Sequence, residues 1–187
     1  MSTRDLVLAA LFAAIIVVLG LLPPIAIGFI PVPITAQSLG VMLAGVVLGA
    51  KRGTVAVLLV LLLVAIGLPV LSGGRGGLAA FAAPTSGFLI GWVFAAFVTG
   101  YLSERLISRS QTGLVQGAGF FLAALTGGVV VLYAFGITYL ALITGLGFKQ
   151  AFLGSLAFVP GDVLKAFVAA LAGRAVMVGY PLLPQRA

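Results

Sequence analysis

Asp162 and Lys165 are two charged residues that stand three positions apart in an apolar stretch near the end of the chain. If this stretch is helical, the spacing puts both side chains on one face. Ionisable groups among apolar spans are costly and by default mark a functional site. A carboxylate accepts N–H groups and an ammonium donates to oxygen, so the pair suits a ligand such as a cyclic urea. The alternative is an ion pair that only pins its helix, although apolar packing can replace such a pair.

A second set of polar groups surrounds Arg75. The guanidinium suits a carboxylate, and glycine lets backbone N–H groups approach a ligand closely. The candidate contacts of this run are Gly73, Gly74, Arg75, Gly76 and Gly77. A flexible turn is the alternative explanation for the glycines, and both explanations stay open.

Three uncharged polar residues complete the candidate set. Thr35 follows a proline-rich connection and is expected to be the N-cap of the next helix. Gln37 comes one residue too early to form a capping box with Thr35, so its amide has no local role and is a candidate for ligand contact. Thr85 follows Pro84 in a second loop. We expect these side chains to lie near Arg75, Asp162 and Lys165.

The composition restricts the class of protein. Of the 187 residues, 63% are hydrophobic and 7% are charged, so residues 1–187 are expected to form one polytopic membrane domain. The chain has no cysteine and no histidine, so thiolate and zinc-thiolate chemistry are excluded, and the commonest general base and metal ligand are absent. No metal site and no enzymatic activity are predicted. The net charge of +7 is scattered between apolar spans, which favours membrane anchoring over nucleic-acid binding.

Hydropathy and proline positions predict an all-α membrane protein with six spans. A tight polar turn is expected at 51–53, and a short surface helix at 148–158. Residues 114–144 are too long for one straight span, so they form either a helix bent near Gly136 or a span with a partly inserted segment. The expected spans are 5–22, 36–50, 54–68, 86–103, one within 114–144, and 160–179.

Six spans place both termini on one side of the lipid bilayer. With that side in the cytoplasm, seven of the ten basic residues lie inside, which satisfies the positive-inside rule. The seven are Arg4, Lys51, Arg52, Arg105, Arg109, Arg174 and Arg186. The polar candidates then converge on the outer side, where loops are expected to cap a ligand pocket.

The first span carries small residues four positions apart. They are Ala9, Ala10, Ala13 and Ala14. Such a face lets helices pack closely, either within this domain or against another membrane subunit.

Three motifs, in this order, resemble the BioY family, the biotin-specific S components of energy-coupling factor (ECF) transporters. They lie at 31–37, at 73–77 leading to 84–88, and at 160–166. The family often has glycine where Ala83 and Ser86 stand here. The resemblance covers nearly the whole chain.

The resemblance implies a multi-pass protein of a prokaryotic cell membrane that binds biotin from outside and needs no cofactor. It also implies a transmembrane coupling subunit and two cytosolic ATPases as partners, with the alanine face of the first span as the docking surface. A homo-oligomer is the alternative if the chain works alone. An S component for another vitamin and a structural membrane subunit are the competing functions.

In a complex with biotin, Asp162 would take the ureido N–H groups and Lys165 the ureido carbonyl. Arg75 with the glycine backbone would meet the carboxylate, and Gln37 would add a polar contact. The opposite assignment, with Lys165 on the carboxylate, is left open.

Overall fold

The computed structural model describes residues 1–26, 28 and 30–183, so Arg186 of the charge argument lies outside the described residues. The described part is helical, with only two isolated β-bridges, Ile25 to Ile34 and Leu71 to Arg75. The helices are α1 Thr3–Gly20, α2 Gln37–Ala65, α3 Ser86–Leu106, α4 Gly113–Leu125, α5 Leu132–Thr144, α6 Phe148–Ser155 and α7 Val159–Gly179. Three short segments complete them: the 3₁₀ turns η1 Leu78–Phe81 and η3 Leu156–Phe158, and the π-helical turn η2 Thr126–Val131.

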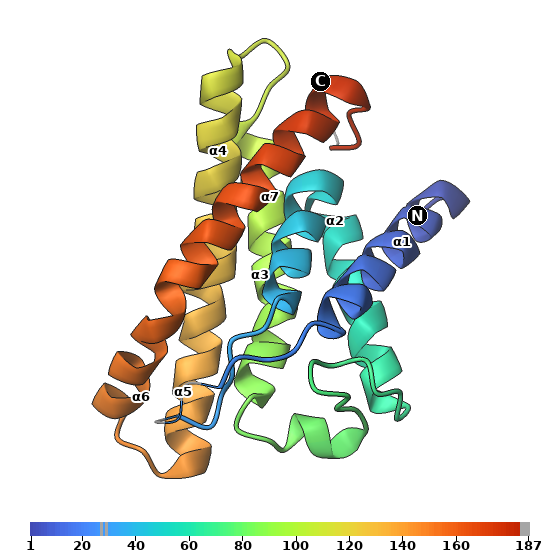
Figure 1. The fold of residues 1–187 in the computed structure, drawn as a ribbon. Coiled ribbons are helices and arrows are strands. Elements are labelled where there is room, and N and C mark those ends of the chain that lie inside the picture. Colours follow the sequence, from blue (N-terminus) through green and yellow to red (C-terminus); the bar gives the residue numbers. More distant parts are fainter. Residues whose placement is uncertain (27, 29, 184–187) are drawn as a thin grey trace.

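Within the described residues, five helical stretches are long and apolar enough to cross a membrane. They are Thr3–Gly20, Gln37–Ala65, Ser86–Leu106, Gly113–Thr144 and Phe148–Gly179. The all-α fold is therefore confirmed and its long apolar helices fit a membrane protein, while the number of crossings and the side of the termini stay predictions. Both termini lie toward the same end of the molecule, and the loops before α2 and before α3 lie toward the other end (Figure 1).

The helix α2 contains a reversal of the chain. Gly49 has a non-helical backbone (φ 81°, ψ −177°) inside it. In a straight helix Ala44 and Gly53 would stand roughly 13 Å apart. Instead, a Cβ added to Gly53 would lie 2.7 Å from the Ala44 carbonyl oxygen. The two halves of α2 therefore fold back on each other (Figure 1), with the break at Gly49 rather than at the predicted polar turn 51–53, because the positive φ favours glycine.

The helix α3 packs directly against this reversal. A Cβ on Gly100 would overlap backbone atoms of Gly49 and Ala50. One turn later, the Glu104 carboxylate accepts a hydrogen bond from the Ala50 backbone N–H at 2.8 Å. Glu104 thus caps the start of the second half of α2.

The stretch 113–144 is one continuous helical element, as the first of the two expectations for it had predicted. The bend expected near Gly136 is absent from this element. The wider π turn Thr126–Val131 joins α4 to α5 instead. Gly127 and Gly128 lie in this turn, and Cβ atoms there would overlap Thr99 of α3 and Met42 of α2. The predicted short helix at 148–158 is present as α6 followed by η3, which runs into α7.

Candidate functional site

A cavity lies between α2, α3, α5, the start of α7 and the loops before α2 and α3. Its empty volume, including the open mouth, is about 590 Å³. The walls are largely apolar and carry a few polar groups. The polar and aromatic residues that line it include Thr35, Gln37, Ser38, Arg75, Thr85, Phe88, Trp92, Tyr133, Phe158, Asp162 and Lys165. The structure thus brings six of the predicted polar side chains to one cavity.

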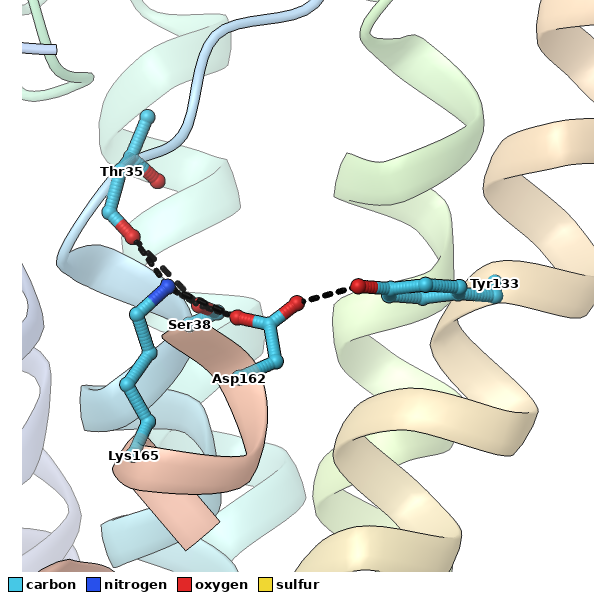
Figure 2. A network of polar contacts seen from close by, with 5 residues as sticks. All are labelled: Thr35, Ser38, Tyr133, Asp162 and Lys165. Carbon is cyan, nitrogen blue, oxygen red and sulfur yellow. Dashed lines mark hydrogen bonds and ion pairs between the residues drawn. The ribbon is translucent and has the colours of Figure 1, made fainter. Parts of the chain in front are cut away.

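Asp162 and Lys165 form an ion pair on the first turns of α7, in which Asp162 is buried and Lys165 is partly buried. Lys165 Nζ lies 2.7 Å from Asp162 Oδ1, and the carboxylate residue is 5% exposed. Proline at the start of α7 leaves the first turn intact because the first N–H groups of a helix have no intrahelical partner. Figure 2 shows the two side chains meeting one turn apart, as the spacing predicted.

Neighbouring groups extend this pair into a network (Figure 2). Lys165 Nζ also donates to the Thr35 carbonyl oxygen at 2.8 Å and to Ser38 Oγ at 3.0 Å. From the other side of Asp162, the Tyr133 hydroxyl donates to Oδ2 at 2.7 Å. All three N–H bonds of Lys165 are therefore used, whereas Asp162 Oδ2 has one partner and can accept a second hydrogen bond.

Arg75 is the second cation on the cavity wall. Its Nε donates to the Ser72 carbonyl oxygen at 3.2 Å, and its Nη1 donates to Thr85 Oγ1 at 3.2 Å. Among the described residues, the carboxylates within ion-pair distance of a cation face Arg52 and Lys165, not Arg75. The Arg75 guanidinium is thus oriented by neutral groups and keeps Nη2 for an anion.

The glycines beside Arg75 shape its loop. Gly73, Gly74 and Gly77 have φ values of 78°, 69° and 80°, which side chains rarely adopt. A Cβ on Gly76 would overlap the Leu68 carbonyl group. None of the four is among the residues that line the cavity, so turn geometry accounts for them and their contact with a ligand stays a prediction.

Thr35 does not play the local role considered for it, and the amide of Gln37 is bonded within the protein. The expectation that Thr35 caps a helix is wrong, because α2 begins at Gln37 after Ala36 and no side chain caps it. Thr35 contributes its carbonyl oxygen to Lys165 instead. Gln37 lines the cavity but is only 1% exposed, and its amide is bonded to backbone groups of Ile16, Val70 and Ser72.

Ser38 and Tyr133 also belong to the site, although neither was predicted from the sequence. Tyr133 is the one side chain with a hydroxyl in the apolar run 127–137, and that was the available signal. Its ring also contacts those of Phe88 and Phe158 edge to face, with centroids 6.3 Å and 6.4 Å away. These three rings line the cavity together and form the aromatic part of its apolar wall.

The alanine face of α1 divides into two. Ala9 and Ala13 are 0% and 5% exposed, because this side of α1 packs inside the domain. The prediction that all four alanines contact a partner is therefore wrong for these two. Ala10 and Ala14 lie on the exposed side of the same helix.

Within the described residues, a helical bundle with an apolar cavity, an ion pair and a guanidinium that faces no carboxylate is typical of small multi-pass membrane proteins that bind a solute between their helices. The model of the BioY family matches residues 1–181, and the chain belongs to that family. This confirms the family resemblance seen in the three motifs.

Relatives and a solved structure agree with this assignment. "Biotin transporter BioY" of Rhizobium etli is 80% identical over 187 residues, covering all of both chains. "Biotin transporter BioY" of Rhodobacter capsulatus is 52% identical, covering 92% of this chain and 93% of its own. The crystal structure of an S-component for biotin from an ECF-type ABC transporter superposes with a TM-score of 0.89 at 36% identity, over 97% of each chain. These relatives are transporters rather than enzymes, in line with the prediction of no enzymatic activity.

Proposed function

We propose that this chain is the biotin-binding subunit of an uptake system and captures biotin from the side opposite its termini. The observation that carries the proposal is that one cavity holds both the Asp162–Lys165 pair and Arg75, a cation that pairs with no carboxylate in the described part of the chain. Biotin has a ureido group at one end and a carboxylate at the other. The names of the relatives at 80% and 52% identity support the same ligand.

The network suggests how each end of biotin is held. The two N–H bonds of a five-membered cyclic urea diverge, so one carboxylate takes only one of them in line. Asp162 Oδ2, which has one partner, accepts that N–H. Lys165 exchanges one of its hydrogen bonds within the protein for a hydrogen bond to the adjacent ureido carbonyl. The aromatic wall packs against the fused rings.

Arg75 then takes the valerate carboxylate through Nη2. It suits this role better than Lys165, because Lys165 already lies against a carboxylate and Arg75 does not. A guanidinium held in place by Ser72 and Thr85 also loses little freedom on binding.

The function is tested by equilibrium binding of biotin to the purified chain in detergent, with other vitamins as competitors. We expect saturable binding of biotin, displaced by unlabelled biotin and not by the other vitamins. Absence of saturable binding by the folded chain contradicts the proposal, and displacement by another vitamin identifies that vitamin as the ligand.

Arg75→Ala is expected to weaken biotin binding roughly 10- to 100-fold, because a hydrogen bond to a charged group contributes about 1.5–3 kcal/mol. The neutral amide of biotin should bind wild type and variant with nearly equal affinity. Isothermal titration with both ligands measures the difference. An equal loss for both ligands would show that Arg75 supports its loop and does not read the carboxylate.

The proposed topology has six crossings, with the two halves of α2 counted separately and the termini in the cytoplasm of a prokaryotic plasma membrane. The reversal at Gly49 and the basic residues near the termini support it. Because the chain has no cysteine, single cysteines can be placed without background at Ala79 and Ser110, which are both exposed. A membrane-impermeant maleimide applied to intact cells should label position 79 and spare position 110; the reverse pattern inverts the topology.

Energy for uptake is proposed to come from a transmembrane coupling subunit and two ATPases, because the chain has no Walker-type phosphate-binding sequence. The exposed small residues Ala10 and Ala14 are the proposed contact, since small residues let helices approach closely. Ala14→Trp should abolish co-purification with the coupling subunit while biotin binding by the chain alone is kept. The alternative is a homo-oligomer. It would be favoured if Ala14→Trp left co-purification unchanged but altered the oligomeric state of the chain.

A further inference from the structure

Gln37 is a buried amide that ties three separate segments together. Its Nε2 donates to the Ile16 carbonyl oxygen of α1 at 3.2 Å and to the Val70 carbonyl oxygen at 3.1 Å. Its Oε1 accepts from the Ser72 backbone N–H at 2.8 Å. Gly20 leaves the space for this arrangement, since a Cβ there would lie 2.8 Å from Gln37 Nε2. The amide is therefore held at both of its ends and has little freedom to turn.

On one side this amide fixes the position of Arg75. The segment that it binds, Val70 to Ser72, closes onto Arg75 through two backbone hydrogen bonds between Leu71 and Arg75, of 2.9 and 3.2 Å. The Ser72 carbonyl oxygen then accepts from Arg75 Nε at 3.2 Å. A shift of the Gln37 amide therefore moves the base on which the guanidinium rests.

On the other side the same residue fixes the Asp162–Lys165 pair. Ser38 follows Gln37 on the first turn of α2, and its hydroxyl lies 3.0 Å from Lys165 Nζ and 3.4 Å from Asp162 Oδ1. A continuous chain of contacts thus runs from Arg75 through Ser72, Gln37 and Ser38 to the ion pair. Both ends of this chain line the same cavity.

We propose that Gln37 is a positioning residue that sets the separation between the ion pair and Arg75, and thereby the length of ligand that the cavity accepts. The inference rests on the proposed function for the chemistry of the ligand, a ureido group joined to a carboxylate. Gln37 acts through Ser72, which contacts Arg75, and through Ser38, which contacts Lys165. These two cations hold the two ends of that ligand. Its own amide is taken up by backbone groups, so it need not touch the ligand.

The test compares biotin with analogues whose acyl chain is one methylene shorter (norbiotin) or longer (homobiotin). A single methylene is worth about 10- to 200-fold where a pocket fits its ligand closely, so wild type should bind biotin at least tenfold more tightly than either analogue. Gln37→Met keeps the volume of the side chain and removes its hydrogen bonds. In this variant we expect the preference to fall to about threefold or less, because Arg75 and the ion pair are no longer held at a fixed spacing.

Two further variants separate positioning from general stability. Gln116→Met is the matched control, because Gln116 is also buried, at 6% exposed, and its Nε2 donates to the Ser108 carbonyl oxygen away from the cavity. It should keep the preference for biotin. Gly20→Ala disturbs Gln37 from α1, since the added Cβ would press on Gln37 Nε2 and on the Val70 carbonyl oxygen. This variant should therefore reduce the preference for biotin over its analogues, as Gln37→Met does.

Titration calorimetry of the three ligands with each variant decides the matter. A uniform loss of affinity for all three ligands in Gln37→Met and Gly20→Ala, with the preference for biotin unchanged, overturns the proposal. If Gln37→Met does not fold, the result with Gly20→Ala decides alone. Failure of wild type to bind biotin would instead overturn the proposed function, and this inference with it.

Discussion

Lys165→Met should abolish tight biotin binding and also destabilise the protein, whereas adding Asp162→Asn to it should restore stability without restoring binding. In the single variant the Asp162 carboxylate, 5% exposed, loses its cation. Leaving a buried charge unpaired costs about 3–5 kcal/mol, while replacing both members of a buried pair by neutral groups is often nearly neutral. The asparagine can still accept from Tyr133. Thermal unfolding in detergent and biotin titration measure the two effects.

The double variant distinguishes a ligand site from a structural ion pair. If the pair only pins α7, affinity for biotin should recover along with stability. If the pair holds the ureido group, the double variant should be nearly as stable as wild type and should bind biotin at least about a hundredfold more weakly, since two charge-assisted hydrogen bonds are lost. Stable protein with wild-type affinity would contradict the proposed site.

The other ion pair provides the matched control. Arg52 Nε lies 3.3 Å from Asp5 Oδ1, with side chains 20% and 26% exposed. A partly exposed pair typically contributes about 0–1 kcal/mol, so Arg52→Met should change stability little. It should leave biotin binding unchanged, because neither residue lines the cavity.

The parts of the site that depend on local spacing could be predicted from the sequence. Asp162 and Lys165 meet because they lie one turn apart on the same helix, and that relation needs no tertiary information. Tyr133 and Ser38 reach Asp162 across 29 and 124 residues of sequence, so only the packing of α2 and α5 against α7 reveals them.

The role of Gln37 shows the same limit from the other direction. Its amide has no partner in the local sequence, and this suggested a ligand contact. The structure places its partners at Ile16, Val70 and Ser72, in segments that the sequence does not show to be neighbours. An amide without a local partner therefore indicates a required polar contact, but the sequence does not tell whether protein or ligand supplies it.

Helix faces were equally ambiguous. Ala9 and Ala13 lie on one side of α1, and Ala10 and Ala14 lie about 100° around it. The sequence contains both sets with the same spacing, so it could not tell which faces inward. Packing of α1 against α2 determines which set faces inward: Ala9 and Ala13 are buried, and the other two alanines are exposed.

Gly100→Ala should sharply reduce the yield and thermal stability of the folded protein. The added Cβ would overlap the backbone of Gly49 and Ala50 at the reversal of α2, and backbone atoms cannot rotate aside as a side chain does. Overpacking of a fitted interior costs typically 1–3 kcal/mol and, against backbone, about that or more. The same displacement would pull the Glu104 carboxylate away from the Ala50 N–H that it caps. Size-exclusion chromatography and thermal unfolding in detergent measure the loss.

Gly117→Ala is the control for the helical propensity of the substitution. Gly117 lies within α4, and a Cβ there would have no atom within 4 Å. Alanine is favoured over glycine in a helix interior by about 1 kcal/mol, so this variant should be as stable as wild type or slightly more stable. If Gly100→Ala matched it, α3 would not pack on the reversal as the structure has it. Because Gly100 does not line the cavity, the fraction of Gly100→Ala that folds should keep wild-type affinity for biotin, which separates the architecture of the reversal from the chemistry of the site.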